Sequence, residues 1–244
     1  MKKILLPTIF AFAATIPASA QSVVQSVFYQ DGDDGTSHLA ASVGFTSNVT
    51  AGNIVVAGMY IDGSAGQATS TDAVFGGVSA DSFFTDLRLY SWVFDDVAGG
   101  SLTFDFTNTG SGGIAIVLYE VSSADFASLT TVTATNAITT SVADELILSF
   151  AGRNNSVAPT ISGSSIFSTQ DYPTSPNVTI WGGGSNASAS ASAPSIGSQN
   201  ISWNTASEGR IAYAFEAGNV IPETSSAALL GVAGLSLLIR RRRS

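Results

Sequence analysis

Short apolar runs of about β-strand length recur along the middle of this chain. Residues 101–107 alternate strictly, with Leu102, Phe104 and Phe106 on one side and polar residues on the other. This period of two is typical of a strand with one buried face. Three other runs are almost continuously apolar, as in strands covered on both faces: residues 53–61, 113–121 and 145–151. We expect further strands at residues 23–29, 87–94, 178–181, 201–204 and 210–216.

Asp-Gly and Gly-Gly turn signals separate these runs, and no segment keeps a period of 3.6 residues. Many short strands between turns predict an all-β protein. We expect residues 21–219 to form an antiparallel β-sandwich of jelly-roll type. Residues 182–198 are of low complexity. They indicate a long flexible loop or a weak edge hairpin, or else a boundary between two small domains.

The first 20 residues have the parts of a signal peptide. A basic start precedes an apolar stretch at residues 4–16, and Ala18 and Ala20 frame a small-residue cleavage site. We therefore expect residues 1–20 to form a signal-peptide helix that is removed, so that the mature chain begins near Gln21.

An apolar run and a group of arginines close the chain. Residues 227–239 are apolar apart from Ser236. As a helix they would span only about 20 Å, which is short of the usual hydrocarbon core. The arginines at 240–243 would hold the C-terminus in the cytoplasm, while the signal peptide sends the domain across the membrane. Both ends therefore predict one topology, with residues 220–244 as an apolar sorting and membrane segment.

The order of parts in this segment resembles the PEP-CTERM sorting signal of Gram-negative bacteria, in which a Pro-Glu-Pro motif precedes an apolar helix and a terminal arginine cluster. Thr224 replaces the last proline of that motif. The positions that carry the resemblance are Pro222, Glu223, Thr224, Arg240, Arg241, Arg242 and Arg243. The resemblance implies cleavage near the motif by an exosortase-type sorting enzyme at the inner membrane. It also implies transient anchoring there, followed by retention or release at the cell surface.

Charge separates the two ends from the middle of the chain. Between Lys3 and Arg240 the only basic residues are Arg88, Arg153 and Arg210, against all 18 acidic residues, which leaves a net charge of −15. A lysine-free acidic surface repels phosphate backbones, so nucleic acid is not an expected partner. The chain has no cysteine, which excludes disulfides and thiolate metal sites.

One acidic segment suits calcium. Asp31, Asp33 and Asp34 lie in the glycine-rich run DGDDG, and carboxylate oxygens are calcium ligands. The run lacks the closing glutamate of an EF-hand, and Asp and Gly also dominate ordinary turns. A calcium site and a solvated acidic loop are both open. His38, the only histidine, has no G-x-S-x-G serine elsewhere in the chain to pair with, so we expect an ordinary surface residue.

Carboxylate pairs and aromatic residues supply two alternatives. Glycoside hydrolysis needs two carboxyl groups facing each other across a cleft. The pairs that the sequence offers are Asp95 with Asp96, Asp144 with Glu145, and Glu120 with Asp125. Arg88, Tyr90 and Trp92 would share one face of a strand and could stack on a sugar, although such stripes also fill cores.

We therefore expect a non-enzymatic cell-surface or extracellular-matrix protein with no catalytic residues and no required cofactor. One alternative is a lectin-like module that binds extracellular polysaccharide, with calcium assisting. A secreted glycan-active hydrolase is the third interpretation, because a fold alone does not confer catalysis.

Overall fold

The computed structural model describes residues 21–31, 40–61, 68–108, 113–122, 130–133, 136–153, 159–161, 164, 167, 171, 185–203 and 209–216. These residues form β-strands joined in antiparallel pairs, which confirms the expectation of an all-β protein with antiparallel sheets. In this part of the chain no helix is long and apolar enough to cross a membrane. The two helices that the sequence predicts, in residues 1–20 and 220–244, lie outside the described residues.

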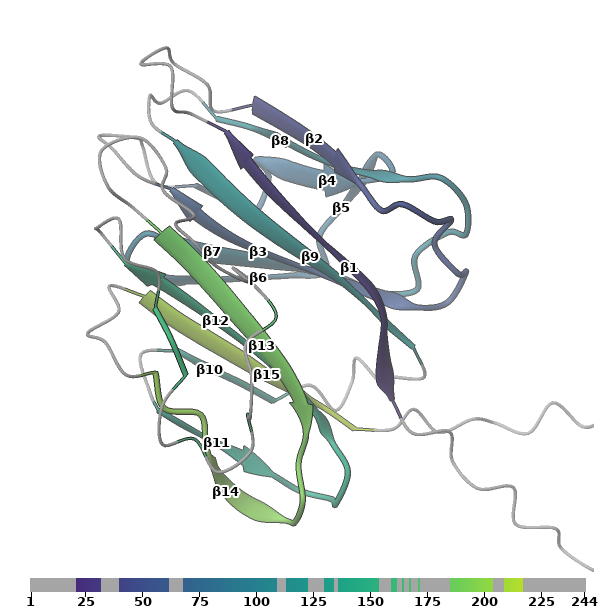
Figure 1. Ribbon diagram of the computed structural model, residues 1–244. Coiled ribbons are helices and arrows are strands. Elements are labelled where there is room, and N and C mark those ends of the chain that lie inside the picture. Colours follow the sequence, from purple (N-terminus) through teal and green to yellow (C-terminus); the bar gives the residue numbers. More distant parts are fainter. Residues whose placement is uncertain are drawn as a thin grey trace, which may run out of the picture. The chain divides into compact units, whose positions relative to one another are not determined.

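The first sheet has five strands in the order β1–β9–β3–β7–β6 (Figure 1). Their bounds are Ser22–Asp31 for β1, Ile114–Ser122 for β9, Ile54–Ile61 for β3, Leu89–Phe94 for β7 and Ser82–Asp86 for β6. Every residue of β3 is buried. A run predicted to be covered on both faces is therefore a strand inside the first sheet.

The second sheet packs on one face of the first. Its order is β2–β8–β4–β5, with bounds Ala40–Gly44 for β2, Thr103–Thr107 for β8, Ala73–Phe75 for β4 and Val78–Ser79 for β5. In β8, Phe104 and Phe106 are buried while Thr103 and Thr107 are exposed, which confirms the predicted alternation. Both phenylalanines meet Trp92 of the first sheet, with ring centroids 5.8 Å apart in each pair.

The third sheet packs on the opposite face of the first (Figure 1). Its order is β10–β15–β12–β13, with bounds Thr130–Thr133 for β10, Gly209–Phe215 for β15, Leu146–Arg153 for β12 and Ser185–Ser192 for β13. Leu148 and Phe150 of β12 share a core cluster with Val56 and Tyr60 of β3. The first sheet is thus buried on both faces.

A two-stranded fourth sheet covers the far face of the third. It pairs β11 (Ala137–Thr140) with β14 (Gly197–Asn200). Ile138 joins Ile147 and Ala212 in one cluster, and the Trp203 indole donates a hydrogen bond to Ser149 Oγ at 3.1 Å. Consequently β12 is also covered on both faces, as its apolar run predicts.

Two predicted strands are wrong in detail. The strand near residues 201–204 is β14, which ends at Asn200, and Trp203 forms only an isolated bridge with Ile161. The strand predicted at 87–94 begins at Leu89, because Leu87 adopts a positive φ of 56° in a tight turn. The strand predicted at 178–181 lies outside the described residues.

The low-complexity segment 182–198 contains a regular strand. Eight residues of it form β13, which pairs with β12 along its whole length. Ala189 and Ala193 are fully buried in the cluster between the third and fourth sheets. All described strands fall in one compact unit, Ala20–Gly218.

Candidate functional site

The residues proposed to stack on a sugar do not form an open stripe. Trp92 is 0% and Tyr90 only 4% exposed. Phe83 stacks on Tyr90 with centroids 6.4 Å apart, and it contacts Trp92 at 5.2 Å. Burial raises the pKa of Tyr90 above its ordinary value. Arg88 lies in the turn before the strand, partly exposed. The two ring faces are occupied by core partners, which leaves no platform for a sugar.

Several candidate residues fall where the structure describes no side chains. Asp31 ends β1, but its side chain is outside the described set. The others outside it are Ala18, Ala20, Asp33, Asp34, His38, Asp125, Pro222, Glu223, Thr224, Arg240, Arg241, Arg242 and Arg243. The calcium and sorting interpretations therefore stay predictions.

Glu120 is a buried carboxylate with three close donors. It is 0% exposed and accepts hydrogen bonds from Gln25 Nε2 at 2.5 Å, from the Thr50 backbone at 2.8 Å and from Asn53 Nδ2 at 2.6 Å. A break in the β1 register after Val23 sets Gln25 opposite Glu120. Because a buried carboxylate needs such donors, Glu120 clamps β1 and the loop before β3 to β9.

Glu145 plays a similar part at the start of β12. It is 1% exposed and accepts hydrogen bonds from the backbones of Ser141 at 2.5 Å and Val142 at 2.7 Å. The Ser141 hydroxyl contacts both Glu145, at 3.1 Å, and the carboxylate of Glu216. Two carboxylates from distant parts of the chain therefore flank one hydroxyl. Glu145 is too buried to reach a sugar. Glu145 and Glu216 therefore stabilise the turn at Ser141 and Val142.

The sequence neighbours Asp95 and Asp96 line a small cavity of about 60 Å³ beside Phe75, Phe94 and other residues. Asp81 Oδ2 accepts a hydrogen bond from the Asp95 backbone at 2.7 Å, and Asp95 Oδ1 accepts one from the Asp96 backbone at 2.9 Å. Within the described ranges, no three histidine or acidic side chains gather as a metal would require. These carboxylates stabilise the turn that follows β7.

A polar network that the sequence did not indicate joins β9 to β13. The Tyr119 hydroxyl donates to Asp171 Oδ2 at 2.9 Å and lies 2.7 Å from Ser188 Oγ. Ser190 Oγ also donates to Asp171 Oδ2, at 2.6 Å. Tyr119 and Ser188 are 0% exposed. The network holds β13 against the first sheet. The low-complexity sequence of β13 contains no pattern from which this network could be predicted.

The two ends of the domain meet. The Gln21 side-chain amide donates a hydrogen bond to the Phe215 carbonyl, and Gln21 is only 4% exposed. Gln21 directly follows the predicted signal cleavage site, and Phe215 ends the last described strand. The predicted signal peptide and the predicted tail are therefore attached at neighbouring points of the domain.

No protein-family model, no curated protein and no solved structure matches this chain. The structure defines its class as all-β, with antiparallel sheets packed face to face.

Proposed function

We propose that this chain is an exported cell-surface or extracellular-matrix protein whose β-domain is a structural unit, sorted through its C-terminal segment. The observation that carries the proposal is that the carboxylates and aromatic rings considered for catalysis or sugar binding have structural roles. Glu120 and Glu145 bind backbone and amide donors inside the domain, and Tyr90 and Trp92 fill its core. Catalytic carboxylates and sugar-stacking rings must reach a ligand, whereas these groups hold strands together.

The strand order supports a jelly-roll assignment for the first nine strands. The order β1–β9–β3–β7 faces β2–β8–β4–β5, and the chain passes repeatedly between these two sheets. Two facing four-stranded sheets of this kind are typical of jelly rolls, with β6 as an additional edge strand. The third and fourth sheets extend that unit. Such a fold hosts many functions and by itself transfers none.

The two chain ends support export and sorting. The signal peptide directs the domain across the inner membrane. The PEP-CTERM-like segment makes an exosortase-type enzyme and the inner membrane its expected partners. Since Gln21 binds Phe215, the N-terminus of the mature domain lies beside the end of β15. The domain would then be attached to the membrane only through the C-terminal segment that follows this strand. This arrangement suits a unit that is tethered and then delivered to the surface.

Fractionation of cells tests the sorting. The full chain should reach the surface or matrix fraction without its terminal arginines. A chain that lacks residues 221–244 should be lost from that fraction, and so should one with all four terminal arginines changed to glutamine, because they are part of the proposed sorting signal. An intact Arg243-Ser244 end in surface material, detected by C-terminal mass spectrometry, would refute tail processing.

A thermal-shift screen tests the structural role. The mature protein should unfold at the same temperature with calcium, with EDTA and with each member of a polysaccharide panel. A rise in melting temperature with one polysaccharide would instead favour the glycan-binding alternative. That alternative would then need a surface other than Tyr90 and Trp92, because both are buried.

A further inference from the structure

Two neighbouring residues tie the start of the domain to two different sheets. The Gln21 side-chain amide donates a hydrogen bond to the Phe215 carbonyl, at the end of β15 in the third sheet. Ser22 begins β1 and pairs with Ser122 of β9 in the first sheet, where the two hydroxyl oxygens lie 3.1 Å apart. The first residues of a domain are poorly ordered unless such contacts tie them down. The start of this domain is therefore fixed to both sheets.

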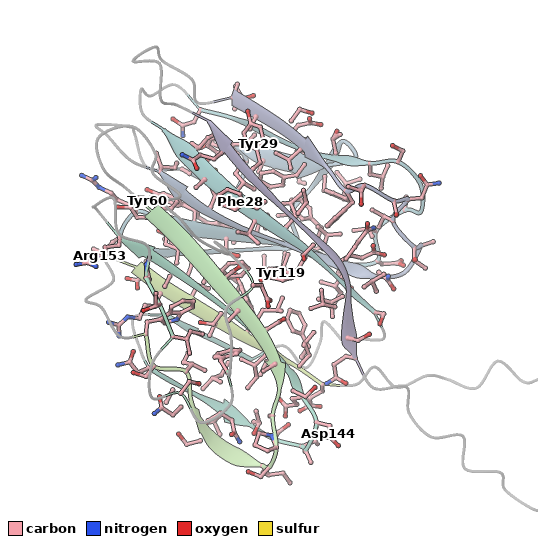
Figure 2. The ribbon with its side chains drawn as sticks, viewed as in Figure 1. Phe28, Tyr29, Tyr60, Tyr119, Asp144 and Arg153 are labelled. Carbon is pink, nitrogen blue, oxygen red and sulfur yellow. The ribbon has the colours of Figure 1, made fainter. Side chains whose placement is uncertain are left out.

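The contact between Gln21 and Phe215 is buried at one end of the third sheet. Phe215 pairs with Leu146 of β12, and Asp144, two residues before Leu146, marks this end in Figure 2. Gln21 is 4% and Phe215 is 0% exposed. A buried polar group that loses its hydrogen-bond partner destabilises the folded state, so the folded domain favours a Gln21 side chain that stays bound to Phe215.

The proposed removal of residues 1–20 makes Gln21 the first residue of the mature chain. Its α-amino group is then free and belongs to the same residue as the side-chain amide. The amino nitrogen can attack Cδ, so that a bond between these two atoms forms and the bond from Cδ to Nε2 breaks. Nε2 leaves as ammonia and takes a proton from the amine. The product is an uncharged lactam, pyroglutamate, which removes the positive charge of the N-terminus, and no oxidant or reductant takes part.

This cyclisation and the contact with Phe215 exclude each other. Pyroglutamate has no Nε2, so the hydrogen bond to the Phe215 carbonyl is lost when the ring forms. The reacting nitrogen and carbon must also come within about 3.5 Å of each other in a suitable orientation. The side chain would have to fold over its own nitrogen at a position where Gln21 is almost wholly buried. The start of β1 must therefore open before the ring can close.

We propose that Gln21 is a modification site that folding closes: it cyclises in the unfolded mature chain and stays glutamine once its side chain binds Phe215. The inference rests on the proposed removal of the signal peptide. Local opening at a chain end is a part of the folded state's own fluctuations, so the rate of cyclisation reports how often this end of the domain opens. Pyroglutamate at residue 21 would mark chains that remained unfolded after export.

Mass spectrometry of the N-terminal peptide measures the reaction, because cyclisation removes one ammonia. The chain from Gln21 to Ser244 is released from a cleavable N-terminal tag and kept in mild detergent, with or without urea at neutral pH. We expect cyclisation to be about tenfold or more slower in the folded chain than in urea, because only the open fraction of the folded chain reacts. Equal rates in the two conditions would overturn the proposal.

A matched control carries Gln-Gly-Ser ahead of Gln21 in the same chain. Its first glutamine lies outside the contact with Phe215 and should cyclise at similar rates with and without urea, which also measures any effect of urea on the chemistry itself. Circular dichroism confirms that both proteins are folded without urea. If Gln21 cyclised as fast as the added glutamine in the folded proteins, the contact with Phe215 would give no protection and the proposal would be wrong.

A failure of export gives a different result. Protein recovered from exporting cells should begin at residue 21. Another first residue would contradict the predicted cleavage site, while the rates for the chain released from its tag would still decide whether the domain protects Gln21.

Discussion

Phe150 of β12 lies over Gly58 of β3. A Cβ atom added at Gly58 would come within 2.2 Å of Phe150 Cδ1. The relationship is reciprocal, since a Cβ at Gly152 of β12 would come within 2.1 Å of Tyr60 Cδ2 on β3. Each sheet places a ring in the space that a missing side chain leaves on the other. These two contacts lock the first and third sheets in one register.

Gly58→Ala should therefore lower the free energy of unfolding by about 1–3 kcal/mol, because the new methyl group forces the Phe150 ring to move. Denaturant unfolding of the full chain measures the change. Gly44→Ala is the matched control, since a Cβ there would lie 3.4 Å from its nearest neighbour. Equal effects of the two substitutions would show that the ring has room to shift.

The contact between Gly58 and Phe150 marks where prediction from the sequence stops. The apolar runs around both residues could be predicted as strands, because burial on both faces makes the sequence of each strand almost continuously apolar. Neither sequence indicates which residue of the facing sheet each glycine will contact, since that depends on how two distant strands pack. The same holds for Ser188, whose burial depends on Tyr119 and Asp171.

Prediction of the candidate sites shows the same division. Glu120 and Glu145 could be singled out as carboxylates near strand ends, but their donors come from turns whose positions the pattern does not encode. Tyr90 and Trp92 could be placed on one strand face. Whether that face met solvent depended on the second sheet, whose strands β4 and β5 are too short to recognise.

Removal of the Glu120 carboxylate should be strongly destabilising. Glu120→Ala leaves the Thr50 amide and the Asn53 side chain without their acceptor, which should cost about 3 kcal/mol or more. Glu120→Gln keeps one acceptor oxygen and should cost less. Urea unfolding compares both with Asp105→Ala, whose carboxylate accepts from Ser42 and Thr103 on the outer face of β8. If Asp105→Ala lowered the free energy of unfolding as much as Glu120→Ala, the burial of Glu120 and its donors would not explain the loss of stability.

Tyr213→Phe should stabilise the protein at neutral pH. The Tyr213 hydroxyl is buried and has no hydrogen-bond partner among the described residues. Ser91 is near it, but the Ser91 hydroxyl donates to the Ala57 carbonyl at 2.6 Å. Removing an unsatisfied buried hydroxyl should raise the free energy of unfolding by about 1 kcal/mol. A loss of stability in urea unfolding would indicate that a buried water binds this hydroxyl.

The same tyrosine should make stability depend on alkaline pH. Burial raises the pKa of Tyr213 far above its ordinary value, so the folded protein keeps the phenolic proton while the unfolded chain loses it above about pH 10. The unfolded state then binds fewer protons, and the free energy of unfolding falls as pH rises, by about 1.4 kcal/mol per unit. The contribution is complete below the ordinary pKa and is lost progressively above it. Urea unfolding of wild type and Tyr213→Phe between about pH 9 and 11 isolates this dependence, since the other tyrosines are common to both. Parallel curves for the two proteins would mean that Tyr213 ionises normally in the folded state.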